Sequence, residues 1–345
     1  GWKPIGSDPQ NGFWGTFDGN GYVIDGLVIN NEGKNIGLFG CLNNASIKNV
    51  GLINVDIKSY AAVGGIAGYL TGTSLIIKSY VTGSITGDTV VGGIAGMVSE
   101  VDCTISDCYS TANIISKQTR NLSVQTGGIV GSLFFGEVVR CYAIGRIAAI
   151  IDNATNIGGL IGELDNESEY AHLYWNTDTC EQTRGIGNIE DTPGLTTIQM
   201  LQQGNFEGFD FDDVWKIENG TSLPYLRMQG DQPDQHNFPL LLYPTGIEGI
   251  AGMYSAELTW TAPNEEMGVP VGYNVYRNGE IVNDGLVQEL SYQDTGLTGW
   301  RTYNYYITAV YDEGESAPSS TIQLVPSGEF AGGDGTENDP FLIEK

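Results

Sequence analysis

The residues of this sequence best suited to chemistry are carboxylates and amides that gather in short turns. The candidate metal ligands are Asp18, Asn20, Asp210, Asp212, Asp213, Asp334, Glu337 and Asp339. Oxygen-rich turns of this kind suit a hard cation such as calcium, although none of them reproduces an EF-hand loop. Side chains in turns also accept hydrogen bonds from their own backbone. Calcium is therefore the predicted cofactor, and solvated turns without a metal are the alternative.

The other carboxylates show no catalytic pair. Glycoside hydrolysis needs two carboxylates roughly 5 to 9 Å apart, whereas Asp56, Asp88 and Asp107 lie where turns or outer faces are expected, with no acidic partner that recurs beside them. The two histidines, His172 and His236, lie outside any HExxH motif. The sequence therefore predicts no catalytic residues and no enzymatic activity.

The charge narrows the range of partners. With 42 acidic against 15 basic residues, the formal net charge is −27, which opposes binding to nucleic acid. No apolar run approaches the ~20 residues of a membrane span. The 49 glycines are about twice the usual share but have no period of three. We therefore expect a turn-rich β-protein that neither binds nucleic acid nor inserts into a membrane.

A repeat sets the elements that must position these residues. A Gly-(Ile/Leu)-x-Gly tetrad occurs at 37–40, 65–68, 93–96, 128–131 and 159–162. The last glycines of successive copies are 28, 28, 35 and 31 residues apart. A second matching element follows each tetrad, and four of these elements contain a tyrosine, namely Tyr80, Tyr109, Tyr142 and Tyr174. Two matching positions in each period indicate a repeat protein.

Between the tetrads, β-branched and apolar residues alternate in short stretches, and no segment keeps a helical period. One such unit cannot bury both faces of its strands, but stacked copies about 4.8 Å apart can. Residues 1–165 are therefore predicted to form a parallel β-solenoid. The glycines would serve corners with positive φ and close contacts between coils. The residues expected to form an inward aliphatic ladder are Ile66, Ile94, Ile129 and Leu160.

Cysteines fit the same repeat. The five of them form no CxxC pair, which disfavours a zinc knuckle. Cys108 and Cys141 occupy equivalent positions in neighbouring coils, at a separation that a disulfide tolerates. We expect buried thiols, since cysteine packs as a small apolar residue.

After the last tetrad the repeat decays. Residues 166–228 are predicted to cap the solenoid, and residues 229–237 to form a linker. Thr196 and Gln199 are spaced as the capping box of a helix that Gly204 would end. The aromatic residues expected to cover the exposed edge of the last coil are Trp175, Phe209, Phe211 and Trp215.

The pattern then changes to spaced strands at 256–260, 272–277 and 303–310, with the turn dipeptide Asn278-Gly279 among them. Together with Trp260 as a buried tryptophan, these strands predict an immunoglobulin-type β-sandwich over residues 238–326. Residues 327–345 are predicted to begin a following domain or to supply an assembly strand.

These residues carry a family resemblance. The tetrad with its Ser/Cys-Tyr follower resembles the GLUG repeat of large bacterial surface and secreted proteins, including non-catalytic parts of IgA-protease-like metallopeptidases. The opening Trp2-Lys3-Pro4-Ile5-Gly6 looks like that family's lead-in, and Leu223-Pro224-Tyr225-Leu226-Arg227 looks like the end of its closing segment. The resemblance implies a location and a general role, because the repeat has no chemistry assigned to it.

The second region also resembles a known module. Trp260, residues 291–297 and residues 314–318 are similar to bacterial fibronectin type III modules, which usually act as spacers or display platforms. Residues 332–343 look like the start of another GLUG-type domain.

The predicted function is a non-enzymatic, extracellular structural or adhesive segment of a bacterial cell-surface protein. The expected partners are a surface polysaccharide or a protein of a host or neighbouring cell. Head-to-tail self-association into a fibre, through an exposed strand at Phe341–Ile343, is a further expectation. The alternative is a carbohydrate-binding or carbohydrate-active accessory region of a larger secreted enzyme.

Overall fold

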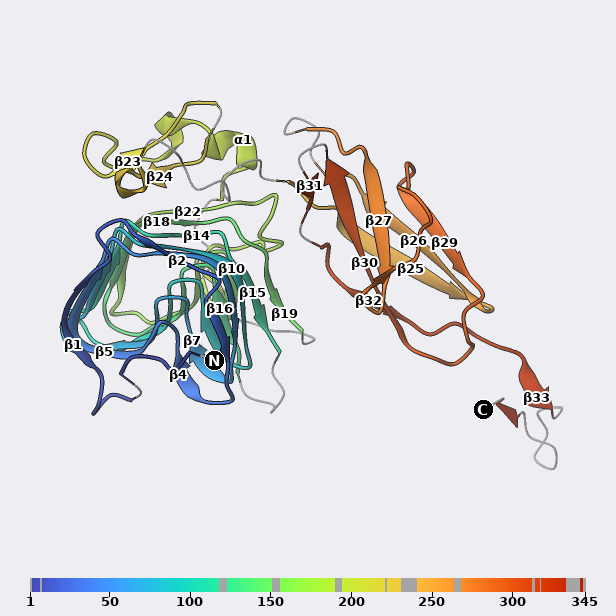
Figure 1. Cartoon of the computed structure of the whole chain (residues 1–345), viewed down its shortest axis with the longest axis horizontal. Coiled ribbons are helices and arrows are strands. Elements are labelled where there is room, and N and C mark those ends of the chain that lie inside the picture. The colour runs from blue at the N-terminus through green and yellow to red at the C-terminus, as the bar shows by residue number, and fades with distance from the viewer. Residues whose placement is uncertain are drawn as a thin grey trace. The chain divides into compact units, whose positions relative to one another are not determined.

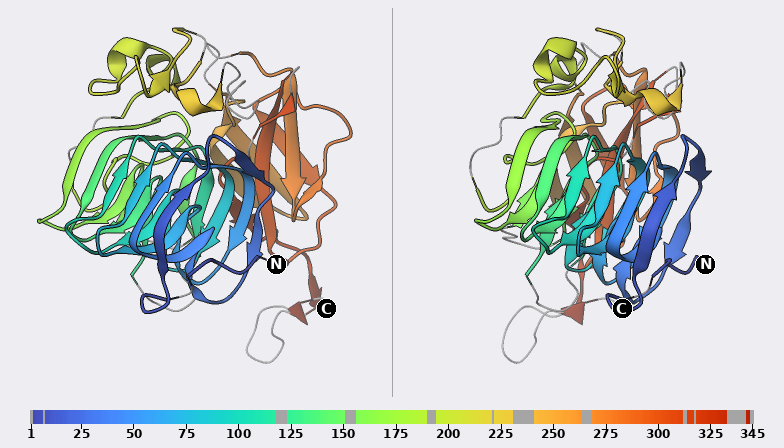
Figure 2. Two further views of the ribbon diagram at one scale, coloured as in Figure 1. Left: turned by 60° about the vertical axis from the view of Figure 1, so that its left-hand side comes forward. Right: turned by 90° about the vertical axis from the view of Figure 1, so that its left-hand side faces the viewer.

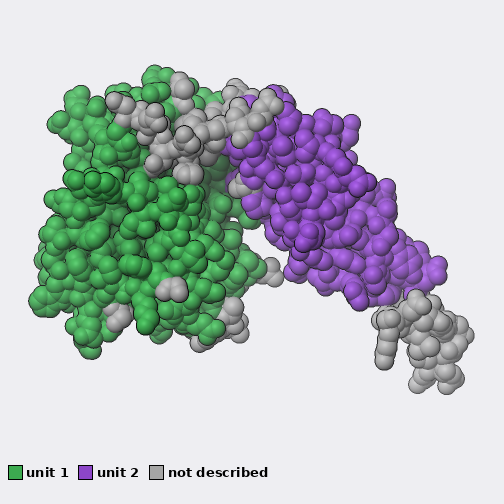
Figure 3. Space-filling model, in the orientation of Figure 1, with its two compact units in different colours: residues 1–237 green, residues 238–345 purple. Residues whose placement is uncertain are grey.

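The computed structural model describes residues 2–6, 8–117, 123–150, 156–189, 194–220, 222–230, 241–263, 268–311, 314–316 and 318–329, and the backbone of 330–332 and 342–343. The chain divides into two compact units, residues 1–237 and residues 238–345 (Figure 3).

The first unit is a parallel β-solenoid whose coils repeat three stretches of strand (Figures 1 and 2). The first stretch contains β1 (Phe13–Asp18), β5 (Phe39–Lys48), β8 (Ala67–Thr71), β9 (Leu75–Ile77), β12 (Ala95–Val98), β13 (Thr104–Ser106), β17 (Val130–Leu133), β18 (Glu137–Ala143), β21 (Ile161–Leu164) and β22 (Glu169–Trp175). The second contains β2 (Val23–Asp25), β3 (Val28–Asn30), β6 (Gly51–Lys58), β10 (Tyr80–Gly87), β14 (Tyr109–Ser110), β15 (Asn113–Ser116) and β19 (Ile147–Ala149). The third contains β4 (Lys34–Ile36), β7 (Ala61–Val63), β11 (Val90–Gly92), β16 (Gln125–Gly127) and β20 (Asn156–Gly158).

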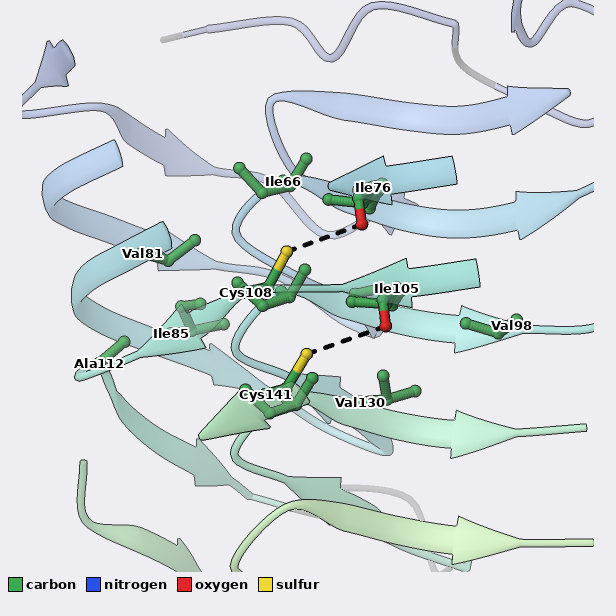
Figure 4. Packing of buried hydrophobic residues seen from close by; sticks show 14 of the residues in the cluster. Ile66, Ile76, Val81, Ile85, Val98, Ile105, Cys108, Ala112, Val130 and Cys141 are labelled. Atoms are coloured by element: carbon green, nitrogen blue, oxygen red, sulfur yellow. Dashed lines mark hydrogen bonds between the residues drawn. The ribbon is translucent and has the colours of Figure 1, made fainter. Parts of the chain in front are cut away.

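Equivalent residues of successive coils lie opposite one another, as the repeat predicted. Leu75, Thr104 and Glu137, for example, are paired in one parallel register. The five tetrads lie in successive coils, and their second residues form an inward ladder. These residues, Leu38, Ile66, Ile94, Ile129 and Leu160, are at most 2% exposed. Figure 4 shows the same lumen filled by side chains such as Ile66 and Val130, and each such burial contributes about 1.5–3 kcal/mol. The predicted solenoid is confirmed.

The tetrad glycines are needed for close contact and not for unusual backbone angles. None of them has a positive φ, so that part of the expectation was wrong. A Cβ at Gly131 would lie 2.7 Å from both the carbonyl oxygen of Gly96 and the amide nitrogen of Val91. The last glycine of the tetrad therefore lets one coil rest on the backbone of another.

Positive φ is found instead at the bend between the first and second stretches, and β18 and β22 run through this bend into the second stretch. Asn49, Lys78, Asp107, Arg140 and His172 are equivalent residues, and all have φ between 49° and 55°. Asparagine and aspartate tolerate this left-handed conformation better than most residues. The bend thus recurs in five coils at one position, although the residue type varies.

Two partial turns flank the five full tetrads, and the second of them lies beyond the predicted boundary at residue 165. Ile5 forms a parallel bridge with Phe39, so that Ile5-Gly6 occupies a tetrad position before the first full tetrad. At the other end Ile186 forms a parallel bridge with Ile161. The short Gly185-Ile186-Gly187 segment is therefore a further, degenerate tetrad, which the sequence analysis missed.

The predicted helix is shorter than expected. Helix α1 (Thr197–Met200) has the capping box of Thr196 and Gln199. Gly204 does not end it, because it lies within the 3-10 turn η1 (Gln203–Asn205). The strands β23 (Trp215–Lys216) and β24 (Tyr225–Leu226) and the 3-10 turn η2 (Arg227–Gln229) follow.

The second unit is the predicted β-sandwich. One sheet has the order β25 (Thr245–Gly252), β26 (Ser255–Thr261), β29 (Ser291–Thr295), and the other contains β27 (Gly272–Arg277), β28 (Glu280–Ile281), β30 (Tyr303–Tyr311), β31 (Gly314–Glu315) and β32 (Ile322–Leu324). A two-stranded pair, β33 (Phe330–Gly332) and β34 (Leu342–Ile343), completes the elements. Trp260 is 5% exposed and packs edge-on against Tyr273. Asn278 and Gly279 both have positive φ and join β27 to β28, as a type I′ turn requires.

Candidate functional site

The first predicted metal turn is already neutralised by protein groups. Asp18 Oδ1 accepts hydrogen bonds from Asn49 Nδ2 and from the backbone amide of Asn20, each at 2.9 Å. Lys48 Nζ lies 3.3 Å from Asp18 Oδ2. The hydrogen bond from Asn49, followed by the others, lowers the pKa of Asp18. These contacts hold the turn together without a metal.

The second predicted turn satisfies its own backbone. Asp210 Oδ1 accepts from the amides of Asp212 and Asp213, at 3.0 and 2.9 Å. Asp334, Glu337 and Asp339 lie outside the described residues. Within the part of the chain that the structure describes, no three His, Cys, Asp or Glu side chains are grouped closely enough to hold a metal. Calcium binding stays a prediction.

The cysteines are buried thiols. All five are free thiols, and each is 0% exposed. The S–H of Cys108 lies within hydrogen-bonding distance of the carbonyls of Ser106 and Ile76, and that of Cys141 of those of Val139 and Ile105. Figure 4 draws the contacts to Ile76 and Ile105. Burial raises the pKa of Cys108, and the neighbouring Cys141 raises it further. Such thiols are poor nucleophiles and poor metal ligands.

The most distinctive group on the outside of the solenoid is a ladder of tyrosines. Tyr80, Tyr109 and Tyr142 stack with ring centroids 5.0 Å apart and interplanar angles of 5° and 2°. They alternate with lumen residues such as Cys108, so they point away from the core. In the preceding coil Gly51 pairs with Tyr80, and a Cβ at Gly51 would lie 2.6 Å from the tyrosine ring. Tyr174 continues the register.

A covering segment, defined here as residues 205–220 and 222–230, lies over the strands that carry this ladder, such as β14, β18 and β22 (Figures 1 and 2). Tyr142 Oη donates to the carbonyl of Pro224 at 2.6 Å, and the hydroxyl of Tyr109 donates to Gln229 Oε1 at 3.1 Å. Phe206 packs edge-on against Tyr174. The segment thus seals the side of the stack, whereas the expected position was the edge of the last coil. The predicted cap residue Trp175 belongs instead to the lumen core.

One buried ion pair fixes the covering segment to the coil. Arg140 forms two hydrogen bonds to the carboxylate of Asp107, at 2.8 and 2.9 Å. Trp215 Nε1 donates to Asp107 Oδ1 at 3.2 Å, and its ring packs on Tyr109 and Tyr142. Asp107 is 5% exposed. Sequence reasoning treated Asp107 as an outer-face residue and missed this pair, although Asp107 and Arg140 occupy equivalent positions of the repeat.

The covering segment forms a cleft of about 710 Å³ together with Gln203 and Gly204, which come directly before it. Its lining residues are Gln203, Gly204, Phe206, Glu207, Phe209, Phe211 and Asn219. Phe209 and Phe211 stack at 6.3 Å, and Phe211 is half-buried. Asn219 Oδ1 accepts from the amide of Gln203 and so orders the rim. Phenyl faces beside amide and carboxylate groups can hold a small polar ring. Of the predicted cap residues, Phe209 and Phe211 lie here.

The sandwich has a polar network of its own. Arg277 Nη1 lies 3.0 and 2.9 Å from the two carboxylate oxygens of Asp294, and Tyr305 Oη donates to Asp294 Oδ2 at 2.8 Å. Because Asp294 is on one sheet and the other two are on the second sheet, the network joins the sheets. Burial, followed by Asp294, raises the pKa of Tyr305. This arrangement is structural, because it holds the two sheets together.

No helix among the described residues is long and apolar enough to cross a bilayer. Several relatives match part of the chain, and three of them are as follows. Halomucin of Haloquadratum walsbyi is 33% identical over 33% of this chain and 1% of its own length. A candidate Gly-rich membrane protein of Evansella cellulosilytica is 34% identical over 33% of this chain and 14% of its own. Exoglucanase B of Cellulomonas fimi is 32% identical over 38% of this chain and 12% of its own. The chain thus spans a small part of each relative.

Solved structures are similar to parts of this chain. A proposed immunoglobulin A1 protease of Bacteroides ovatus is similar over 66% of this chain and 81% of its own, with a TM-score of 0.52 and 20% identity, which shows a shared fold. A Fn3-like protein of Clostridium thermocellum covers 25% of this chain and 93% of its own, with 25% identity and a TM-score of 0.21.

The family model described as the GLUG motif matches residues 59–86. This range holds β7 to the end of β10, except for its last residue, and so corresponds to one coil. The chain therefore carries a GLUG motif within a parallel β-solenoid, followed by a fibronectin type III-like sandwich, as the sequence predicted.

Proposed function

We propose that this chain is a non-enzymatic structural segment of an extracellular bacterial surface protein, in which the solenoid acts as a rigid spacer. The observation that carries the proposal is the uninterrupted packing of the lumen, where ladder residues such as Ile66, Ile94 and Ile129 are 0% exposed. A filled lumen leaves no room for a substrate inside the coils, and stacked, packed coils form a stiff element. The relative described as a membrane protein supports a location at the cell envelope.

Immunolabelling of cells that make the natural full-length protein tests the location. We expect an antibody against the sandwich to label intact cells. Labelling that requires permeabilised cells would contradict an extracellular role. A screen of the purified chain against polysaccharides and peptides should show no turnover, and turnover that survives removal of contaminants would reject the non-enzymatic role.

A second candidate function is carbohydrate binding, for which the cleft on the covering segment is the specific observation. Phe211 offers a half-buried ring, and Glu207 is exposed beside it. The relative named Exoglucanase B is consistent with a place among carbohydrate-active proteins. The ligand class would be a neutral surface polysaccharide, because the net charge of −27 opposes an acidic one.

A glycan array with the purified chain tests this candidate. Saturable binding that falls about tenfold in Phe211→Ala, a change of about 1.4 kcal/mol, would support it. Tyr170→Ala is the matched control, because Tyr170 is an aromatic residue of β22 that is 36% exposed outside the cleft. Equal loss in both variants, or no binding to any glycan, would reject it.

A further inference from the structure

The sheet of the sandwich that contains β27 and β30 (Figure 1) has a row of apolar and aromatic side chains on its outer face. Tyr276 on β27 pairs with Ile281 on β28 and with Tyr306 on β30. The adjacent residues Val275 and Ile307 are 0% exposed and face the core, so the side chains of the row point outward. Ile281 is 50% exposed, and both tyrosines are half-buried.

The two tyrosines of this row form a stacked pair. Their ring centroids are 4.6 Å apart, and the ring planes lie at 14° to one another. Tyr276 Oη donates a hydrogen bond to Glu315, whereas the hydroxyl of Tyr306 forms none among the described residues. The face of a tyrosine ring attracts cations through its π-electrons. The pair is therefore a fixed aromatic platform that suits a flat or cationic group.

A carboxylate is held beside this platform. Glu315 on β31 accepts hydrogen bonds through Oε1 from Asn274 Nδ2 and from Tyr276 Oη, each at 2.9 Å. Thr308 Oγ1 on β30 donates to the same oxygen. Desolvation opposes the ionisation of Glu315, but these three hydrogen bonds outweigh it and lower the pKa of the carboxyl group. The carboxylate is therefore fixed in position and ionised at neutral pH.

The negative charge beside the platform has no counter-charge in the described part of the sandwich. Glu315 forms no ion pair there, and its Oε2 accepts no hydrogen bond. A second carboxylate, that of Glu280, is exposed on β28 and is likewise without an ion pair. Desolvation, followed by Glu315 and Glu280, raises the pKa of Tyr306. The platform thus lies in a negative potential that no ion pair neutralises.

The inner side of the same unit shows how such groups hold a cation. Arg277 donates to both carboxylate oxygens of Asp294, at 3.0 and 2.9 Å, and its guanidinium carbon lies 5.8 Å from the ring centroid of Tyr303. A carboxylate and a tyrosine ring thus bind a guanidinium group within this chain, whereas the outer face has the carboxylate and the rings without the cation. Residues 238–345 contain 16 acidic and three basic residues, so the charge of this unit attracts a basic partner.

We propose that this outer face binds an arginine side chain of a basic segment in a protein partner. The apolar stem of the arginine would lie on Ile281 and on the tyrosine rings, and its guanidinium group would stack on Tyr306 and donate to Glu315 Oε2. A neutral sugar ring can also stack on tyrosine, but it would leave the ionised carboxylate without a counter-charge, so charge complementarity favours the cation. The inference goes beyond a spacer role, since it gives the sandwich a binding partner.

Fluorescence anisotropy of a dye-labelled Gly-Arg-Gly-Arg-Gly peptide, titrated with the full chain at physiological salt, tests the proposal. We expect saturable binding, and binding at least about tenfold weaker when citrulline, which has the shape of arginine without its charge, replaces both arginines. Glu315→Gln should weaken binding of the arginine peptide at least about tenfold, about 1.4 kcal/mol. Glu257→Gln is the matched control, because it removes the same charge from an exposed residue of β26 in the other sheet, and it should bind as the unaltered chain does.

A pair of substitutions at Tyr306 tests the platform separately. Tyr306→Ala should weaken binding, whereas Tyr306→Phe should keep it, because the ring and not the hydroxyl contacts the peptide. Circular dichroism shows whether each variant is folded, and Glu315→Gln alone decides the matter if Tyr306→Ala is not. The absence of saturable binding, or equal weakening in Glu315→Gln and Glu257→Gln, would overturn the proposal. So would binding to a glycan array that Tyr306→Ala abolishes while the peptide does not bind, since the face would then recognise sugar.

Discussion

At the scale of single residues, the tetrad glycines allow close contact between coils because they have no Cβ. A Cβ at Gly131 would lie within 2.7 Å of backbone atoms from Gly96 and Val91, which cannot move as a flexible side chain could. Gly131→Ala should therefore lower the free energy of unfolding by about 1–3 kcal/mol or more. The measurement is the midpoint of urea unfolding.

Gly204→Ala is the control for that substitution. A Cβ at Gly204 would meet no atom within 4 Å, and the φ of Gly204 is not positive. Alanine there should leave the midpoint unchanged or raise it slightly, because it lowers the entropy of the unfolded chain. Equal effects of the two substitutions would contradict the contact explanation.

The buried thiols make stability depend on pH. Burial raises the pKa of Cys41 and Cys103 to about 11, and that of Cys180 to about 12. In the unfolded chain these thiols ionise near pH 8.5. Above that pH the unfolded state loses protons that the folded state keeps, so the free energy of unfolding falls as the pH rises towards 11.

Urea unfolding at pH 7, 9 and 10.5 checks this dependence. The midpoint should already fall between pH 7 and pH 9, because most unfolded thiols are ionised at pH 9, and it should fall further at pH 10.5. Replacement of Cys41 and Cys103 by alanine should reduce the loss between pH 9 and 10.5, even though it lowers stability at pH 7. A slope that is the same with and without these thiols would assign the effect to other groups.

At the scale of elements, the covering segment is held mainly by Trp215. Its ring contacts Phe209, Tyr109 and Tyr142, with a centroid separation of 4.7 Å to Phe209, and its Nε1 donates to Asp107. Trp215→Ala should cost about 3–5 kcal/mol and expose the tyrosine ladder. Trp215→Phe keeps most of the packing and should cost less, chiefly the hydrogen bond of about 1.5–3 kcal/mol to a charged group.

Limited proteolysis and hydrogen exchange measure this effect locally. Faster cleavage within residues 205–220, together with faster exchange in β10 and β14, is the expected result for Trp215→Ala. Val101→Ala, at a side chain 65% exposed, is the control. Unchanged protection of these strands in Trp215→Ala would show that the segment contributes little to the solenoid.

Sequence patterns predicted the repeating elements well because each coil repeats the same local requirement. The tetrads, the inward isoleucines and the strand at 272–277 were all found where the pattern placed them. The position of the covering segment could not be predicted in the same way, since it depends on contacts between residues such as Tyr109 and Gln229, which are far apart in the chain. Tyr109 and Tyr142 come two residues after Asp107 and Arg140 and point outward. A row of outward-pointing tyrosines was the sequence signal that could have indicated a covering segment.

The candidate site was likewise predicted only in part from the sequence. Composition indicated oxygen-rich turns, but the partners of Asp18 and Asp210 are set by neighbouring backbone and by Asn49 in the next coil. The cleft beside Phe211 has no sequence motif, because it arises from the path of an irregular segment. The repeat pattern therefore predicts the coils of the solenoid, whereas the surface features depend on irregular segments that have no repeat.

At the scale of the whole molecule, the charge of −27 should make stability sensitive to salt. Self-repulsion of a highly charged chain destabilises the compact state, and salt screens it. We expect the melting temperature to rise with sodium chloride, and to rise equally with calcium and magnesium at matched ionic strength. Differential scanning calorimetry checks both expectations.

A larger rise with calcium would identify a specific site. Asp210→Asn would then test the turn at residues 210–213, and Asp18→Asn the turn at residues 18–21. Loss of the extra stabilisation in one of them would locate the metal. A melting temperature that is independent of salt would contradict the importance of self-repulsion.

The equivalence of the corner residues Asn49, Lys78, Asp107, Arg140 and His172 has a consequence for how such chains change in length. Because each coil enters and leaves at the same point of its outline, the segment between Gly68 and Gly96 can be lost or duplicated while the next coil still meets a matching neighbour. The loss or gain of one coil changes the length of the solenoid by about 4.8 Å. Such a change requires a single deletion or duplication, so the length of the solenoid can evolve in steps of one coil.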